Sequence, residues 1–342
     1  MSTFLSLEQQ QHKIDVTFIE NALVDILLKT SDEKLKLFGM QKGIMQLVDK
    51  ETQLNILKKL SNIPVEIELG GSASNVARGI AILGGSASYS SVIGHDEYGE
   101  KFSKRLKELN ILNRLQVVNS DATGTCLVIV TLDGERTMNT HLGACRKYQK
   151  EFIPFDDIRA SKIFFSTGYM LDTQEQIDSL HAAMDFALLN NVKIAFDVAD
   201  AFVIQRHGVQ TILDLFSKTH IVFANSAEAE MLFGCHGLNA AKELAKYVEI
   251  GMIKDGANGS FLCYQEKITH IPTNKVTVVD TTGAGDMYAA GFLYGLCRNY
   301  SLELSCQIGS LLASDTVTHM GVRLSAGIEN TCRRIRAFDW KE

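Results

Sequence analysis

Seven residues in the C-terminal part of the chain combine two glycines with a carboxylate. They read Asp280, Thr281, Thr282, Gly283, Ala284, Gly285 and Asp286. The β-branched run 275–279 before them predicts a strand or an extended approach, and the apolar pattern over 287–297 predicts a helix. A glycine turn at the amino end of a helix directs backbone N–H groups toward one point. Together with the positive end of the helix dipole, this arrangement predicts an anion site.

Asp286 would lie at the mouth of that anion site, where it could take a proton from a hydroxyl that attacks a phosphate. The segment is not a Walker A loop, because the chain contains no Gly-Lys-Ser/Thr sequence. A dinucleotide fingerprint would need a third glycine where Tyr288 stands. The simple alternative is a strand-to-helix turn with an acidic residue in the first helical turn. Among the chemical readings, the segment favours phosphoryl transfer to an alcohol.

The composition is that of an ordinary globular protein, with 342 residues, 46% hydrophobic and 22% charged. A formal net charge of −6 argues against a general nucleic-acid binder. Seven scattered cysteines without a Cys-x-x-Cys pair predict reduced core thiols. Residues 1–13 are polar and lack a signal-peptide core, and no apolar run is long enough to span a bilayer. We therefore expect a cytoplasmic protein with no membrane partner.

Strand and helix patterns alternate from residue 160 onward. Apolar runs at 162–167, 193–198, 220–224, 251–254 and 260–264 predict strands, and 174–189, 227–233, 240–248 and 302–319 predict helices. Alternation of this kind is typical of a mostly parallel sheet covered on both faces.

The first 150 residues follow a different pattern. An opening strand is predicted at 13–19 and a glycine-rich entry into a helix at 70–85. The segments 44–48, 65–69, 124–132 and 136–141 alternate without helices, and Asp133-Gly134 is a hairpin signal. They predict a small antiparallel sheet, built from about 24–68 and 122–142, that would form a lid over an active site.

Four segments in this order resemble the PfkB, or ribokinase-like, family of carbohydrate and nucleoside kinases. They are residues 21–25, the Gly70-Gly71 run to Asn75, the pair Asn225 and Glu228, and residues 280–286. The resemblance spans about residues 14–325 and implies a single kinase domain over 1–342. Its fold would be a three-layer α/β/α core with a mostly parallel sheet and a small β-sheet lid.

The resemblance also implies the roles of the glycine segment. Asp286 would be the base, and the backbone of Gly283, Ala284 and Gly285 would form the anion hole around the transferring phosphoryl group. A carboxylate at a helix amino terminus should have a low pKa. A weak base suffices, because the proton leaves late in a loose transition state.

The resemblance also assigns residues of the amino-terminal half to the acceptor. Asn21 and Asp25 match the pair of the family that binds hydroxyl groups, and carboxylate and amide groups suit vicinal hydroxyls. Gly70 and Gly71 would let the backbone approach the substrate closely, and Asn75 would add a side-chain contact. The alternatives are an Asx turn at residues 21–25 and a helix cap by Ser72 or Ser74.

The donor would be ATP with Mg²⁺. Asn225 would contact ATP and the metal, with Glu228 acting on the metal through water, although the same pair is also a capping box. Lys254 and Gly256 would lie near the phosphates and ribose of ATP. The resemblance further implies that Asp280 and Thr282 lend oxygens to a monovalent cation such as K⁺.

The lid segments and residues 21–49 are similar to those of adenosine kinases and their bacterial relatives. This similarity implies that adenosine is phosphorylated at its 5′-hydroxyl to give AMP in purine salvage. Arg136 would contact the substrate, with apolar walls from Leu23, Met138 and Tyr169 or Met170. The sequence departs from the family pattern at Glu20, where a glycine is usual. That difference bears on the identity of the substrate more than on the chemistry.

Other readings remain open at this point. Within the family, the acceptor could be inosine, guanosine or a free sugar such as ribose or fructose. Outside it, the chain could be a catalytically silent nucleoside sensor or a nicotinamide oxidoreductase, and the missing third glycine disfavours the latter. The protein would act as a monomer or as a homodimer joined at the sheet edge of the lid.

Overall fold

The computed structural model describes residues 12–37, 40–133, 135–328 and 330–331. The amino-terminal segment 1–11, Gly134 of the predicted hairpin and Cys332 lie outside these residues. Within the described part of the chain, no helix has the length and apolar character needed to cross a membrane.

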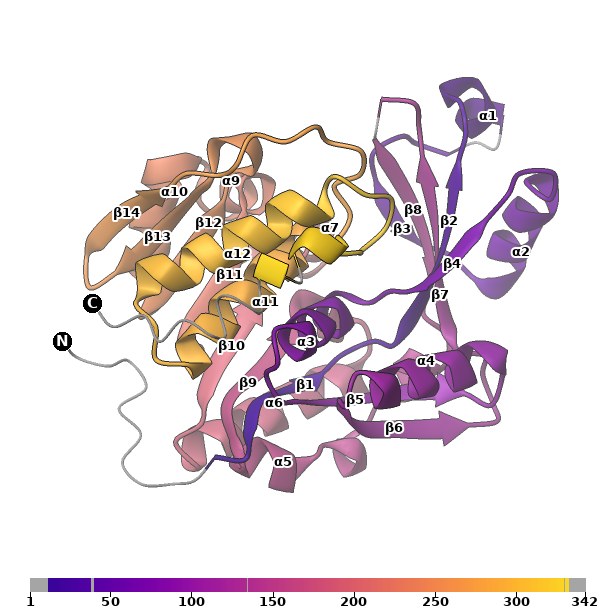
Figure 1. The fold of residues 1–342 in the computed structure, drawn as a ribbon. Coiled ribbons are helices and arrows are strands. Elements are labelled where there is room, and N and C mark those ends of the chain that lie inside the picture. The colour runs from indigo at the N-terminus through magenta and orange to yellow at the C-terminus, as the bar shows by residue number, and fades with distance from the viewer. Residues whose placement is uncertain (1–11, 38–39, 134, 329, 332–342) are drawn as a thin grey trace.

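A nine-stranded sheet forms the body of the molecule (Figure 1). Its strand order is β14-β13-β12-β11-β10-β9-β1-β5-β6, and only β13 and β14 run antiparallel to their neighbours. The strands are β1 (Ile14–Ile19), β5 (Ala87–Gly94), β6 (Leu112–Val118), β9 (Ser161–Thr167), β10 (Lys193–Asp197), β11 (Ile221–Asn225), β12 (Ile250–Lys254), β13 (Ser260–Tyr264) and β14 (Lys267–Ile271).

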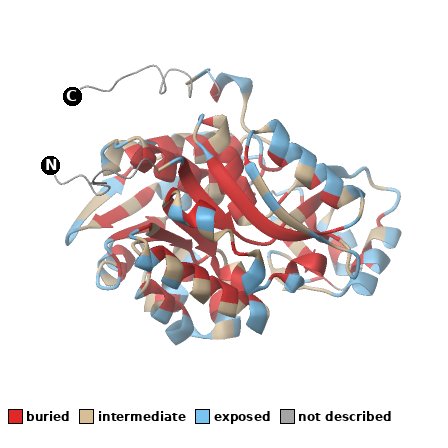
Figure 2. Ribbon diagram, turned by 90° about the horizontal axis from the view of Figure 1, so that it is seen from below, coloured by how far each residue is buried: buried red, intermediate tan, exposed pale blue. Residues whose placement is uncertain are grey.

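Helices cover both faces of this sheet, so the body has three layers. Ile221 and Phe223 of β11 belong to the core on one face, and Val222 and Ala224 to the core on the other, because successive side chains alternate. Buried strands between half-exposed helices are visible in Figure 2. The first face carries α3 (Ser72–Ile82), α4 (Glu97–Glu108), α11 (Ala284–Cys297) and α12 (Leu302–Thr316). The second carries α5 (Phe155–Arg159), α6 (Gln174–Leu189), α7 (Ala201–His207), α8 (Val209–Phe216), α9 (Ser226–Phe233) and α10 (Gly237–Leu244).

A second sheet of five strands stands beside the body, in the order β3-β8-β7-β2-β4. One face packs on two helices through an apolar cluster that includes Leu28, Leu35 and Ile56. The other face, with Cys126, Val128 and Met138, lines a cavity. Its elements are β2 (Leu23–Lys29), α1 (Asp32–Leu37), β3 (Met45–Leu47), α2 (Lys50–Lys59), β4 (Glu66–Leu69), β7 (Gly124–Val130) and β8 (Arg136–His141).

The structure corrects three expectations for these regions. The small sheet is mixed, because β2 pairs with β7, and β3 with β8, in parallel. Helices α1 and α2 lie in a segment that was expected to lack them. Of the two forms predicted for residues 275–279, the strand is excluded and the extended approach remains, and Val276 and Val278 are exposed. β-branched residues favour an extended backbone, but an extended segment forms a strand only when its backbone is hydrogen-bonded to a neighbouring strand.

Candidate active site

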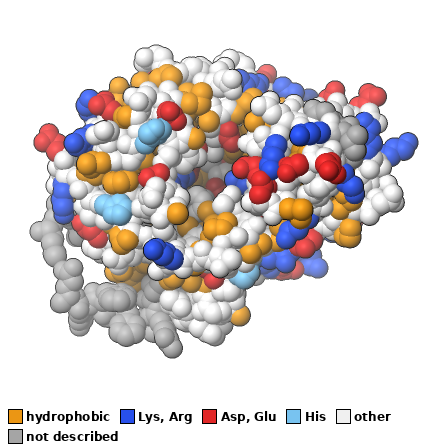
Figure 3. Space-filling model, turned by 90° about the horizontal axis from the view of Figure 1, so that it is seen from above, with side chains coloured by type: hydrophobic (Ala, Val, Ile, Leu, Met, Phe, Trp, Pro, Cys, Tyr) orange, Lys and Arg blue, Asp and Glu red, His pale blue; other side chains and the backbone are white. Residues whose placement is uncertain are grey.

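A cavity of about 830 Å³ lies between the carboxyl ends of the parallel strands and the small sheet. Glu20, Asp197, Asn225 and Lys254 line it where neighbouring strands of the main sheet end. Ligand sites of open α/β sheets form at this edge. Figure 3 shows a hollow near the centre of one face, around which acidic and basic side chains are interspersed.

The glycine turn lies on one side of this cavity, at the amino end of α11. Gly283 has a left-handed backbone, with φ at 69°, and precedes the first residue of the helix. A Cβ atom there would lie 2.5 Å from Val322 Cγ2, so glycine is needed for both backbone and packing reasons. Gly283, Ala284 and Gly285 all line the cavity, and the first N–H groups of a helix lack intrahelical partners.

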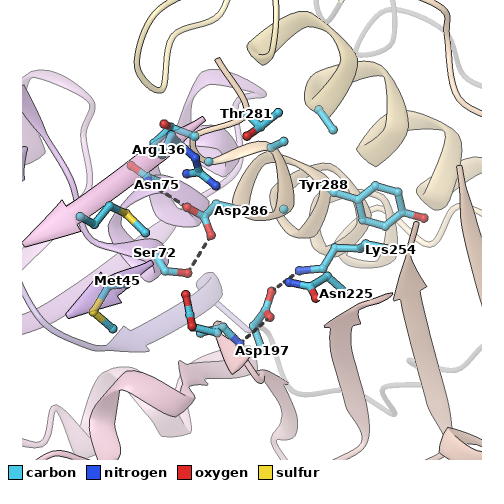
Figure 4. A pocket seen from close by; sticks show the side chains of 18 of the residues that line it. Met45, Ser72, Asn75, Arg136, Asp197, Asn225, Lys254, Thr281, Asp286 and Tyr288 are labelled. Carbon is cyan, nitrogen blue, oxygen red and sulfur yellow. Dashed lines mark hydrogen bonds and ion pairs between the residues drawn. The ribbon is translucent and has the colours of Figure 1, made fainter. Parts of the chain in front are cut away.

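Asp286 follows in the first turn of α11 and points into the cavity (Figure 4). Ser72 Oγ donates a hydrogen bond to Asp286 Oδ1 and Asn75 Nδ2 donates one to Oδ2, both at 2.7 Å. Burial raises the pKa of Asp286 above its ordinary value, although these two hydrogen bonds oppose the shift. The expected low pKa is therefore wrong, because desolvation outweighs the helix terminus at this position.

Asp25 projects from β2 into the same cavity. Its carboxylate accepts no hydrogen bond from the described residues, and burial raises its pKa to about 7. A Cβ atom on Gly70 would lie 2.0 Å from Asp25 Oδ1, so glycine at that position makes room for this carboxylate. Gly70 itself does not line the cavity among the described residues, whereas Gly71 does.

Asn21 and Asn75 line the cavity beside these carboxylates. Asn21 Nδ2 donates to the Tyr169 carbonyl at 3.1 Å, and Gln176 Nε2 donates to Asn21 Oδ1 at 2.9 Å. These contacts fix the Asn21 amide and leave one N–H and one lone pair free. Helix α3 begins after Gly71 without a side-chain cap, so neither serine considered as a cap has that role.

A buried ion pair also lines the cavity. Lys254 Nζ lies 2.8 Å from Asp197 Oδ2, and a Cβ atom on Gly285 would lie 3.0 Å from the same ammonium. Lys254 therefore lies directly against the glycine turn. Figure 4 shows Lys254 together with Asp197 and Asn225. Burial alone would lower the pKa of Lys254, but Asp197 and Glu228 raise it, so the ammonium stays charged.

Asn225 and Glu228 form a capping box at the start of α9. Asn225 N donates to Glu228 Oε2 at 2.9 Å, and Asn225 Oδ1 accepts from Glu228 N at 3.0 Å. Burial and the nearby Asp197 raise the pKa of Glu228 to about 8. No group of three His, Cys, Asp or Glu among the described residues could hold a metal. The role of Asn225 and Glu228 toward Mg²⁺ stays a prediction.

Asp280 is fully buried below the glycine turn. Thr282 N and Thr282 Oγ1 donate to its Oδ1 at 2.9 and 2.6 Å, and Gly321 N donates to Oδ2 at 2.9 Å. These three hydrogen bonds stabilise the buried carboxylate. A monovalent cation bound at this loop stays a prediction. Lys254, Gly256 and Asn225 all line the cavity.

The cavity also has apolar walls. Leu23, Met138 and Tyr169 line it as expected, with Arg136 reaching in from β8. Met170, which was predicted as a wall, is fully buried in the core around α6 and does not line the cavity. Sequence patterns do not distinguish Tyr169 from Met170, because both lie in one short helix, 168–171. Of the two, only Tyr169 faces the cavity.

Two further residues at this site were not predicted. Asp197 ends β10, and its place near the carboxyl end of the strand predicted at 193–198 was the available signal. Ser72 lies within the glycine-rich run, but its bond to Asp286 joins residues 214 positions apart, and no local pattern reveals such a contact.

Glu20 lies on the floor of the cavity, directly after β1. Its Oε1 accepts from Asn21 N at 2.8 Å and its Oε2 accepts from Thr167 Oγ1. Burial raises the pKa of Glu20 to about 7, and Asp286 and Asp197 add to the shift. The side chain that replaces the usual glycine is thus anchored to the floor by protein donors.

The raised pKa of Glu20 predicts how stability depends on pH. Its folded pKa of about 7 exceeds the usual 4.5, so its contribution to stability is present below pH 4.5 and is lost as pH rises through 7. We expect Glu20→Gln to match the wild type near pH 5 and to exceed it on the order of 3 kcal/mol at pH 8. Urea unfolding at both pH values measures this difference. A variant that is less stable at pH 8 would show that ionised Glu20 is stabilised in the fold.

The cavity at the edge of the α/β sheet combines a glycine turn, the carboxylates of Asp25 and Asp286, and the buried Lys254. This combination fits an enzyme that handles small anionic substrates. The model of the pfkB family of carbohydrate kinases matches residues 24–328. The chain belongs to this family, and it is a phosphotransferase with an alcohol group as acceptor.

Individual relatives agree with this assignment. The structure of adenosine kinase from Sinorhizobium meliloti is 32% identical, with a TM-score of 0.89, and covers 94% of this chain and 99% of its own. A probable sugar kinase from Rhizobium etli is 29% identical, also at 0.89, covering 96% and 100%. Adenosine kinase of Saccharomyces cerevisiae is 25% identical over 88% of this chain and 94% of its own. The family and the three-layer fold expected from the sequence are confirmed.

Proposed function

We propose that this enzyme is an adenosine kinase, which transfers the γ-phosphoryl group of ATP to the 5′-hydroxyl of adenosine. The observation that carries the proposal is the set of residues that line the cavity. Asp25 and Asp286 line it together with the apolar residues Leu23, Met45 and Met138 of the small sheet, and this combination suits a sugar with an attached flat base. The relatives that phosphorylate adenosine point to the same acceptor.

Val276, Val278 and Val317 also line the cavity. They would contact the adenine of ATP, with the phosphates directed toward Lys254 and the glycine turn. Mg²⁺ would neutralise charge on these phosphates, with Glu228 and Asn225 holding its waters.

The transfer itself would proceed in line. The 5′-oxygen attacks the γ-phosphorus, the bond to the β,γ-bridging oxygen breaks, and Asp286 accepts the hydroxyl proton as ADP leaves. Ser72 and Asn75 fix the orientation of the Asp286 carboxylate, and each oxygen keeps a lone pair that can accept the proton. Asp25 would hold the ribose hydroxyls, and the N–H groups of the glycine turn would hold the phosphoryl oxygens.

A comparison of acceptors tests the proposal. With ATP and Mg²⁺, we expect kcat/KM for adenosine to exceed those for ribose and fructose by at least about a hundredfold, since the base adds apolar contacts. Inosine and guanosine carry a flat purine as well, and a higher kcat/KM for either of them than for adenosine would refute adenosine as the acceptor. A preference for a free sugar, as the relative from Rhizobium etli suggests, would refute adenosine and leave the kinase class intact.

A matched pair of variants locates the base. Met138→Ala should raise KM for adenosine about tenfold, because one apolar contact with the base is lost. It should leave KM for ribose unchanged. Met231→Ala, on the exposed face of α9, is the control and should change neither value. Equal effects of Met138→Ala on both acceptors would place the base elsewhere.

A further inference from the structure

A second cavity lies outside the site described above, between residues of the small sheet and of the body. Figure 1 shows where the small sheet meets the body. Its volume is about 540 Å³, and β4, α3, α4 and the loop after α12 contribute to its walls. The charged residues around it are predominantly basic, and the others are apolar. The charged ones are Arg78, Lys101, Lys104, Arg105 and Arg323, against Glu68 and Glu108.

Most of these cations are already neutralised by protein carboxylates. Lys101 pairs with Glu97 at 2.7 Å, Arg105 with Glu108 at 3.1 Å, and Arg323 with Glu66 and Glu68. Arg78 and Lys104 belong to no ion pair within the ranges that the structure describes. The cavity therefore has two cations available to an anionic ligand.

Arg78 is the more informative of the two. Its side chain is only 9% exposed, and its Nη2 donates to Asn75 Oδ1. Its Nε finds no hydrogen-bond partner among the described residues. Buried polar groups are seldom left unpaired. Burial lowers the pKa of Arg78, and the nearby carboxylates of Asp25 and Glu68 oppose this shift without cancelling it, so the charge is only partly compensated. A guanidinium fork with free donors matches the oxygens of a phosphate.

We propose that this cavity binds a phosphate group, either inorganic phosphate or that of a small phosphomonoester, between Arg78 and Lys104. Arg78 would donate from its fork, and Lys104 would supply a second charge from the rim of the cavity on α4. An apolar wall of the cavity is formed by Ile82, Leu109 and Met287, and the organic part of a phosphomonoester would pack against it.

The same arginine connects this cavity to the active site. Arg78 holds the oxygen of the Asn75 amide, so that the amide nitrogen faces Asp286 Oδ2 at 2.7 Å. A phosphate that draws the guanidinium toward itself releases Asn75 and loosens the orientation of Asp286. Occupancy of the cavity therefore lowers kcat. This step rests on phosphoryl transfer at Asp286, but not on adenosine as the acceptor.

Charge reversal on α4 tests the binding. Lys104 lines the cavity, whereas Lys107 is exposed on the same helix and does not line it. Inorganic phosphate is titrated calorimetrically into full-length protein whose nucleotide site is filled with a non-hydrolysable ATP analogue and Mg²⁺. We expect Lys104→Glu to weaken phosphate binding about tenfold or more, and Lys107→Glu to change it less than about twofold. Ribose 5-phosphate in a parallel titration distinguishes a phosphomonoester ligand from free phosphate.

Turnover provides the second readout. Without added phosphate, both variants should keep the wild-type kcat, since neither lysine contacts the active site. Added phosphate should lower kcat of the wild type and of Lys107→Glu, and have a much smaller effect on Lys104→Glu. Phosphate binding that survives in Lys104→Glu, or that is absent from the wild type, overturns the site. Binding that is lost in Lys104→Glu while inhibition persists overturns the connection to Asp286.

Discussion

Asp286→Asn should lower kcat at least about a thousandfold and leave the fold intact. An amide cannot take the hydroxyl proton, and general bases contribute roughly 10²–10⁴ to such rates. The amide would also present an N–H group to Ser72 or Asn75, both of which donate to the carboxylate in the wild type. A coupled assay of ADP release measures the loss of turnover.

The stability of the same variant separates chemistry from folding. Burial raises the pKa of Asp286, so a neutral side chain relieves part of the desolvation cost while one hydrogen bond is lost. We expect the free energy of unfolding to change by less than about 1 kcal/mol. Asp214→Asn, on the surface helix α8, is the control and should keep full turnover. An Asp286→Asn enzyme that retained a tenth of wild-type turnover would exclude Asp286 as the base.

The main sheet could be predicted largely from the sequence, because its central strands are continuous apolar runs bounded by turns. Helix α6 was predicted with the bounds that the structure gives it. Strand β5 was not recognised, since its serines and tyrosine interrupt the apolar pattern although the whole strand is buried. Its hydroxyl groups find partners from distant segments, such as Tyr148 for Ser90, and this compensation is visible only in the structure.

The small sheet shows a different limit. Alternation with period two identifies a strand and its buried face, but not the direction of its neighbour. Strands β2 and β7 are parallel because a long stretch of chain, including α3, α4, β5 and β6, separates them. The short polar helices α1 and α2 cover the outer face of this sheet, and their pattern is too brief to stand out.

The residues of the candidate site could likewise be predicted only in part. Motif residues such as Asp25, Asn75 and Asp286 could be named because they stand in short, characteristic runs. Asp197 and Ser72 could not, because their roles depend on contacts with Lys254 and Asp286 across the fold. The direction of the pKa shift at Asp286 was also missed, since burial is a tertiary property that outweighs the local effect of the helix end.

Lys254→Met should have the other large effect, on both stability and activity. The lysine is 14% exposed and its partner Asp197 is 3% exposed, with 2.8 Å between Nζ and Oδ2. Removing the ammonium leaves Asp197 buried beside Glu228 without a cation, which costs about 3–5 kcal/mol of unfolding free energy. Because the ammonium also lies against Gly285, kcat/KM for ATP should fall about a hundredfold or more.

A second substitution separates the two roles of Lys254. In Lys254→Met combined with Asp197→Asn, no uncompensated carboxylate remains at this position, so most of the lost stability should return. Activity should stay low, because the cation beside the glycine turn is still absent. Unfolding curves and ATP kinetics of the two single variants and the double variant complete the cycle. Recovery of turnover together with stability would show that Lys254 serves only to neutralise Asp197, and the phosphate would then have to be held by the turn alone.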